Sequence, residues 1–91
     1  MNNKQTNTQY IGVDGIPRNK EKDQELSLTV AQVFQTDSGK EVLKYLRSIT
    51  IELVHGANVT NEELRHAEGQ RFLVGLIESR INHAHKVKSN E

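Results

Sequence analysis

The sequence predicts an all-α fold, a small helical domain of about three helices that follows a flexible polar N-terminal arm. Apolar residues recur every three or four positions from about residue 23 onward, which is the period of a helix with one buried face. Capping signals and glycines divide this stretch into helices at 23–35, 38–55 and 61–86. Residues 1–22 show no such period and hold the only proline. We therefore assign 1–22 to the arm and 23–91 to the helical domain.

The first helix is predicted from four apolar residues that share one face, Leu26, Val30, Val33 and Phe34. A turn at residues 36–39 should end it. Ser38 and Glu41 then have the spacing of a capping box, in which two side chains bind otherwise unpaired backbone amides, so the second helix should begin at 38. It is expected to run to His55, with Gly56 as a left-handed cap. Residues 49–54 also alternate and are rich in β-branched side chains, so a short strand is a competing prediction there.

The third helix has the clearest start, because Thr60 and Glu63 form another capping box ahead of Asn61. Its apolar residues cover an arc of roughly 200°, wider than a helix that packs on one neighbour needs. We expect this arc to be a protein interface, formed by Phe72, Leu73, Leu76, Ile77 and Ile81. Gly69 and Gly75, which are costly inside a helix, would let another backbone approach closely.

Composition excludes several classes of protein. The 91 residues are 34% hydrophobic and contain no cysteine, so disulfide scaffolds, thiol nucleophiles and thiolate zinc sites are excluded. Equal numbers of basic and acidic residues, 12 of each, exclude a strong overall attraction to nucleic acid. No window approaches the roughly 18 apolar residues of a membrane span. A core this small is marginally stable alone, so we expect a homo-oligomer or an obligate partner.

Catalytic and metal sites are not expected. His83 and His85 lie two positions apart, so on a helix they point in nearly opposite directions, whereas ligands of one ion need a spacing of three or four. No serine lies in a nucleophile elbow and no glycine-rich phosphate loop is present. The sequence therefore predicts a protein that is not an enzyme, with no cofactor, no metal and no small-molecule substrate.

Nucleic-acid contact is a second prediction that the sequence leaves open. Lys40, Lys44 and Arg47 recur on one face of the second helix, which a tight turn joins to the first, as in a helix-turn-helix. Glu41 lies beside these cations, and no cluster of amide or aromatic side chains accompanies them for base recognition. A solvated charged face is the simpler interpretation.

Two segments of the chain resemble the Bbp19-like small proteins of tailed bacteriophages over about residues 31–82. That family pairs an F-x-(S/T)-x-x-G-x-x-V-L-x-x-L segment with a downstream E-G-x-R and an apolar helix. The positions that match are Phe34, Gly39, Val42, Leu43 and Leu46 in the first segment and Glu68, Gly69 and Arg71 in the second. Gln70 stands where a second arginine is common. The resemblance implies a small phage protein encoded among virion-assembly genes.

Physically, the second segment is interpreted as a helix-packing device. Glu68 and Arg71 would form an ion pair, and Gly69 would let the first or second helix approach. The alternative is that Arg71 meets a carboxylate of a partner or a phosphate. The leading hypothesis is a non-enzymatic virion or assembly component that binds itself or other phage structural proteins, in the virion or the host cytoplasm. The alternatives are a DNA-binding or packaging accessory and a phage inhibitor of a host protein.

Overall fold

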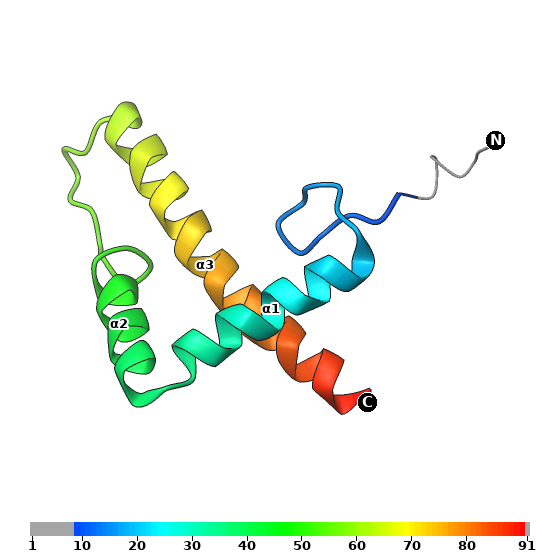
Figure 1. The fold of residues 1–91 in the computed structure, drawn as a ribbon. Coiled ribbons are helices and arrows are strands. Elements are labelled where there is room, and N and C mark those ends of the chain that lie inside the picture. Colours follow the sequence, from blue (N-terminus) through cyan, green and yellow to red (C-terminus); the bar gives the residue numbers. More distant parts are fainter. Residues whose placement is uncertain (1–8, 91) are drawn as a thin grey trace.

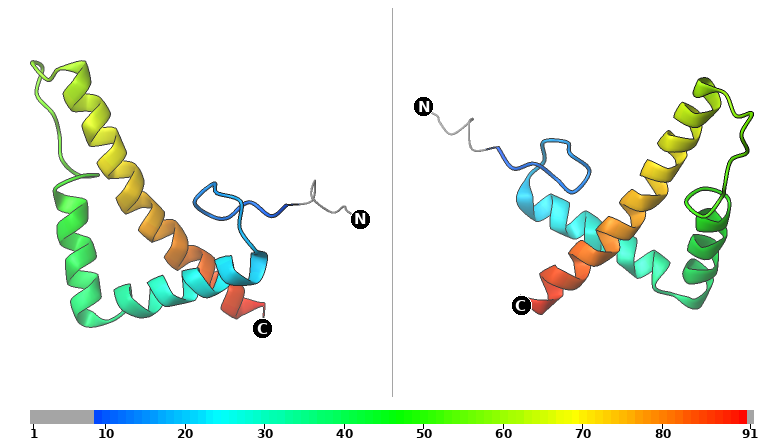
Figure 2. Two further views of the ribbon diagram at one scale, coloured as in Figure 1. Left: turned by 45° about the horizontal axis from the view of Figure 1, so that its top comes forward. Right: turned by 180° about the vertical axis from the view of Figure 1, so that it is seen from behind.

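Three helices make up the fold, in agreement with the all-α prediction. The computed structural model describes residues 9–90, with α1 at Lys20–Phe34, α2 at Asp37–Ser48 and α3 at Asn61–Ser89. A tight corner joins α1 to α2, and a longer linker leads to α3, which runs back and crosses α1 (Figure 1). The views in Figure 2 show the three helices as the sides of an open triangle.

The molecule is thin for a chain of this length. Its principal extents are 56 × 34 × 15 Å, and its radius of gyration is 16.7 Å, whereas a compact domain of this length has about 12 Å. The core is correspondingly small and lies at the α1–α3 crossing, where Ala31, Ile81 and Ala84 are buried. Five partly buried apolar residues pack against these three: Leu28, Val30, Phe34, Leu43 and Ile77.

The segment before α1 is more structured than the predicted arm. Residues 9–19 form a loop closed by an antiparallel bridge between Ile11 and Pro17, and Gly15 at φ +79° allows its turn. Asn19 caps α1 by accepting a hydrogen bond from the Lys22 amide at 3.1 Å. The helix thus begins at residue 20 rather than 23. Residues 1–8, the rest of the expected arm, lie outside the described residues.

The second helix differs from its prediction at both ends. Its cap is Thr36, whose hydroxyl accepts from the Gly39 amide at 2.9 Å, so the capping box predicted for Ser38 and Glu41 is wrong. The helix ends at Ser48, and residues 49–54 form turns and irregular backbone, neither the predicted helix nor the strand. The predicted left-handed cap at Gly56 is also wrong, because its φ is not positive.

The start of α3 confirms the sequence prediction. The Glu63 amide donates to the Thr60 hydroxyl at 3.1 Å, and the Thr60 amide donates to the Glu63 carboxylate at 2.8 Å, which is a complete capping box. The helix continues to Ser89, three residues past the predicted end. None of the described helices is long and apolar enough to cross a membrane.

The packed face of α1 coincides only in part with its predicted apolar stripe. The residues of α1 that are buried against α3 are Asp23, Ser27 and Ala31. From the predicted stripe, Val30 and Phe34 pack on the core, whereas Val33 stays 55% exposed and Leu26 38% exposed. The predicted stripe is therefore only half right, because α1 also buries polar residues against α3.

Candidate functional site

A buried polar cluster holds α1 against α3. The Nη1 atom of Arg80, on α3, donates to the carboxylate of Asp23 at 2.6 Å, to the backbone oxygen of Asp23 at 3.0 Å and to the Ser27 hydroxyl at 3.0 Å. Asp23 and Ser27 are fully buried and Arg80 nearly so. Burying charges is tolerated only where they are paired and hydrogen-bonded. The arginine from α3 therefore explains why α1 can bury a polar face.

The loop of residues 9–19 docks on the same cluster. The Asp14 carboxylate lies 3.3 Å from Nη2 of Arg80 and accepts from Nε of Arg18 at 2.8 Å. The hydrogen bond from Arg18 is the main cause that lowers the pKa of Asp14 from 3.8 to about 2, and it outweighs the effect of burial. A Cβ on Gly12 would lie 2.6 Å from Oδ1 of Asp23, so the loop approaches more closely than a side chain would allow. Two arginines and two aspartates leave the cluster electrically neutral.

Ser27 and His83 form a hydrogen-bonded pair beside this cluster, with 2.7 Å between the hydroxyl and Nδ1 of the ring. Such a pair is found in serine hydrolases, where the histidine activates the hydroxyl as a nucleophile. Here the Ser27 side chain is fully buried, and its oxygen also accepts a hydrogen bond from Arg80. A substrate has no access to this hydroxyl, so we assign the pair a structural role.

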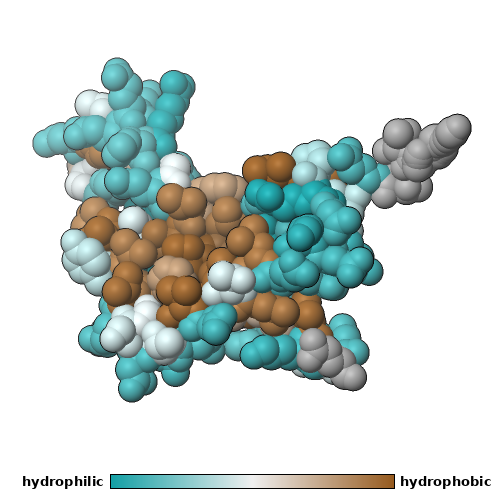
Figure 3. All heavy atoms as spheres, viewed as in Figure 1, coloured by the Kyte–Doolittle hydropathy of each residue, from teal (hydrophilic) through white to brown (hydrophobic). Residues whose placement is uncertain are grey.

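An apolar groove runs between α1 and α3, and Arg80 is one of the residues that line it. Its volume is about 170 Å³, and it is lined by Leu26, Val30, Leu73, Leu76 and Ile77, with Asp14 and Arg80 at its polar end. Figure 3 shows apolar side chains gathered into one broad patch on the face seen in Figure 1, over the region where the helices meet. The groove thus combines five apolar side chains from α1 and α3 with one acidic and one basic residue.

The five residues predicted to form the interface divide between surface and core. Phe72 and Leu73 are 66% and 61% exposed, and Leu76 and Ile77 are half-buried in the wall of the groove. Ile81 is buried in the protein's own core beside Ala31 and Ala84. The apolar arc of α3 is therefore only partly used within one chain.

The glycines of α3 have no close neighbour. A Cβ added at Gly69 or at Gly75 would meet nothing within 4 Å. The expectation that Gly69 lets α1 or α2 approach is therefore wrong. Within one chain, neither glycine serves the close packing that would offset its cost in a helix.

The first segment of the phage motif builds the corner between α1 and α2. Phe34 ends α1 and packs on the core, and Thr36 caps α2. A Cβ at Gly39 would collide with the Val33 carbonyl oxygen and lie 2.7 Å from Cα of Phe34. Only glycine fits this contact. Further along α2, Leu43 packs on the core and Leu46 is half-buried.

Arg71, from the second segment, fixes the linker between α2 and α3. Its Nε donates to the Thr50 carbonyl at 3.1 Å and its Nη2 donates to the Leu53 carbonyl at 2.8 Å. The guanidinium thus satisfies backbone oxygens that an extension of α2 or a strand would otherwise use. The ion pair predicted between Glu68 and Arg71 does not form, because Arg71 binds these two backbone carbonyls instead and Glu68 is exposed.

Comparison with known protein families shows to which family the chain belongs. The model of the family described as Bbp19-like phage protein matches residues 30–88, well over half of the chain. The chain belongs to this phage protein family. No curated protein and no solved structure matches it. The match begins within α1 and includes the corner, the linker and nearly all of α3, so the resemblance seen in the two sequence segments is confirmed.

The cations proposed for nucleic-acid contact are not equally available in this Bbp19-like protein. Arg47 donates to Glu78 on α3 at 2.5 Å and to Glu52 at 3.2 Å, so its charge is neutralised within the chain. Lys40 and Lys44 remain exposed on α2. Of the three cations, Lys40 and Lys44 are therefore left for nucleic-acid contact, and the acidic Glu41 directly follows Lys40.

The residues that sequence reasoning missed are those of the buried cluster: Asp14, Asp23, Ser27, Arg80 and His83. One signal was present, because Arg80 directly precedes Ile81, at the end of the apolar arc of α3. An arginine in such a place is buried only with a partner. The partners, on α1 and in the loop, lie more than 50 residues away in the sequence and are not indicated by any local pattern.

Proposed function

We propose that this protein is a non-enzymatic component of the phage particle or of its assembly, and that it works by binding protein subunits. The observation that carries the proposal is the apolar groove between α1 and α3, with Phe72 and Leu73 exposed beside it. Contiguous apolar surface of this kind on a soluble protein marks an interaction site. The site of action is the virion or the host cytoplasm in which it assembles.

The shape of the fold supports the proposal. A thin triangle buries few side chains, so much of the favourable free energy that apolar burial supplies is not gained within one chain. A protein subunit placed over the groove would cover Leu26, Phe72 and Leu73 and supply that burial. Arg80 and Asp14 pair with each other at the end of the groove, so they leave no net charge there to oppose an apolar partner.

A second copy of the chain is the first partner we propose, and other phage structural proteins are the next. A twofold axis between two copies would bring the groove of one copy against the groove of the other. Gly69 lies one turn before Leu73 on α3 and is open to an approaching backbone, which suits close contact between α3 helices of two copies. The ion pairs of Arg47 disfavour the DNA-binding alternative.

Mass spectrometry of purified phage particles and of their assembly intermediates tests the proposal. We expect the protein at a fixed copy number relative to the capsid protein, and we expect Leu73→Asp to abolish its incorporation. Val54→Asp is the matched control, because Val54 is 89% exposed on the linker away from the groove. Absence of the wild-type protein from particles and intermediates alike would overturn the proposal, and recovery with a host protein instead would favour the inhibitor alternative.

A further inference from the structure

A polar pocket lies at the end of the molecule where the loop of residues 9–19 meets α1 and the last turns of α3. Its volume is about 440 Å³, and it is lined by Tyr10, Lys20, Gln24, His83, Lys86, Val87 and Asn90. Two of these side chains are cationic and none is acidic. A pocket with this lining is suited to a ligand that is rich in hydrogen-bond acceptors and negatively charged.

The buried cluster determines which hydrogen His83 offers to the pocket. The Ser27 oxygen accepts from Arg80, so the hydroxyl hydrogen needs an acceptor of its own in a fully buried place. Nδ1 of His83, at 2.7 Å, is that acceptor. The neutral ring then carries its hydrogen on Nε2, and the protonated ring would carry one there as well. His83 therefore acts as a donor toward the pocket.

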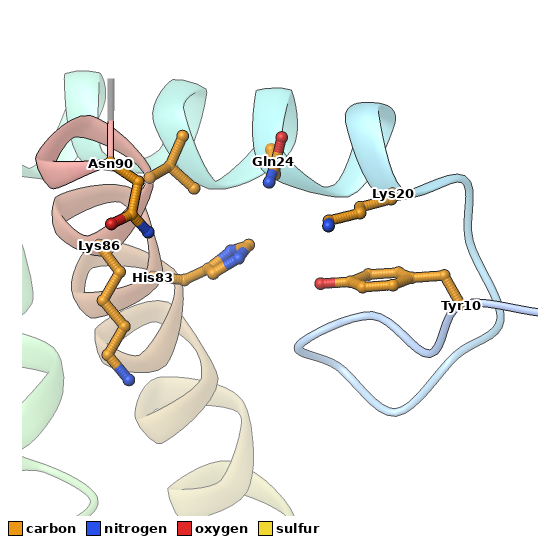
Figure 4. A pocket seen from close by; sticks show the side chains of 7 residues that line it. Tyr10, Lys20, Gln24, His83, Lys86 and Asn90 are labelled. Atoms are coloured by element: carbon orange, nitrogen blue, oxygen red, sulfur yellow. The ribbon is translucent and has the colours of Figure 1, made fainter.

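Other donors converge on the same space. Figure 4 shows the hydroxyl of Tyr10 and the ammonium group of Lys20 pointing toward the His83 ring, with the amide of Gln24 above them. The ammonium group of Lys86 points away from this group of side chains. The inner part of the pocket thus offers one fixed positive charge, from Lys20, together with neutral donors.

One charge with several neutral donors matches a singly charged oxyanion. A dianionic phosphate is usually held by two or more cations, as in arginine clusters, whereas a carboxylate needs one charge and a few hydrogen bonds. The first turn of α1, which contributes Lys20, carries the positive end of that helix dipole and adds a small favourable effect. The last turn of α3 carries the negative end of its dipole, which Lys86 and Lys88 offset.

We propose that this pocket binds a carboxylate group, of the kind that an aspartate or glutamate side chain of a protein partner presents. This inference deepens the proposed function, and it rests on that function only for the identity of the molecule that carries the carboxylate. The partner would then be recognised at two places, through apolar contact at the α1–α3 groove and through one charged group at this pocket. The second contact sets the orientation of the partner.

Titration of the purified full-length chain with acetate tests the pocket directly, with chloride replaced so that ionic strength stays constant. We expect a saturable change in the NMR signals of the His83 ring. The His85 ring is an internal control, because it lines a different hollow beside Leu28 and Gln35. Lys20→Met should weaken acetate binding by about tenfold or more, the usual effect of losing a charge-assisted hydrogen bond. Lys22→Met removes the same charge from an exposed site near Glu25 and should not change binding.

Three results would overturn the inference: equal and unsaturated changes at His83 and His85, unchanged binding in Lys20→Met, or tighter binding of inorganic phosphate than of acetate. The last result would assign the pocket to phosphate groups instead. The titration uses neither the phage particle nor the apolar groove. Its failure is therefore distinguishable from failure of the particle experiment with Leu73→Asp.

Discussion

Arg80 links three parts of the chain through a single guanidinium group. It binds Asp23 and Ser27 of α1 and lies against Asp14 of the preceding loop. A buried ion pair contributes little net free energy compared with a well-packed apolar pair, but removing one member leaves the other charge buried and unpaired. The stability of the crossing should therefore depend strongly on this one residue.

Arg80→Met should lower the free energy of unfolding by about 3–5 kcal/mol, the usual cost of breaking a buried pair from one side. Urea unfolding followed by circular dichroism measures this change. A variant that does not fold even without urea would be the extreme form of the same result. Arg65→Met, at an exposed position of α3, is the control and should stay within about 0.5 kcal/mol of the wild type. Similar midpoints for the two variants would contradict the role assigned to Arg80.

Asp14 gives the fold a defined sensitivity to acid. Its pKa is about 2 in the folded protein against 3.8 without partners, so the unfolded chain binds this proton more readily. The stabilisation is complete above pH 4 and is lost as the pH falls toward 2. The stability of Asp14→Asn should therefore fall less than that of the wild type as the pH is lowered from 4 to 2. Unfolding midpoints measured from pH 5 to pH 2 test this expectation. An unchanged pH profile in this variant would argue against the loop contact.

At the scale of the elements, the corner between α1 and α2 is the most constrained connection. Gly39→Ala would place a methyl group against the Val33 carbonyl oxygen, so we expect a loss of about 1–3 kcal/mol as the corner is forced apart. Gly69→Ala is the matched control, because nothing lies near that position and alanine favours a helix by about 1 kcal/mol. Both substitutions are made in the Leu73→Asp background, which we expect to be monomeric, and their thermal unfolding should shift in opposite directions. A shift in the same direction would contradict the description of the corner.

The elements also show what the sequence can and cannot predict. The start of α3 was predicted correctly because its capping box is local: Thr60 and Glu63 are three residues apart and need no other part of the chain. The polar part of the packed face of α1 and the end of α2 were not predicted because distant arginines determine them. Arg80 pairs with Asp23 and so offsets the cost of burying its carboxylate. Arg71 donates hydrogen bonds to the carbonyls of Thr50 and Leu53.

Candidate site residues follow the same division. The exposure of Phe72 and Leu73 agrees with the wide apolar arc read from the period of α3. Ile81 belongs to the same arc and is nevertheless buried, because α1 crosses α3 at that level and brings Ala31 against it. Periodicity along one helix shows which residues share a face; the position of the crossing, which is a tertiary property, determines which of them stay exposed.

At the scale of the whole molecule, three helices arranged as a triangle leave an apolar groove that one chain does not cover. A second copy that covers it would convert exposed Leu73 and Phe72 into buried contacts on both subunits. The polar pocket at Tyr10, Lys20 and His83 lies at the loop end of the same molecule, where it would bind an acidic side chain of the same partner. Both surfaces fit a component whose structure is completed by assembly.

Sedimentation equilibrium of the purified protein is the most direct test of this account. We predict reversible self-association at micromolar concentration for the wild type and for Val54→Asp, and a monomer for Leu73→Asp, whose added charge would be buried at the interface. A wild-type protein that stays a well-folded monomer throughout this range, or a Leu73→Asp variant that associates as strongly as the wild type, would contradict the claim that a second copy covers the groove.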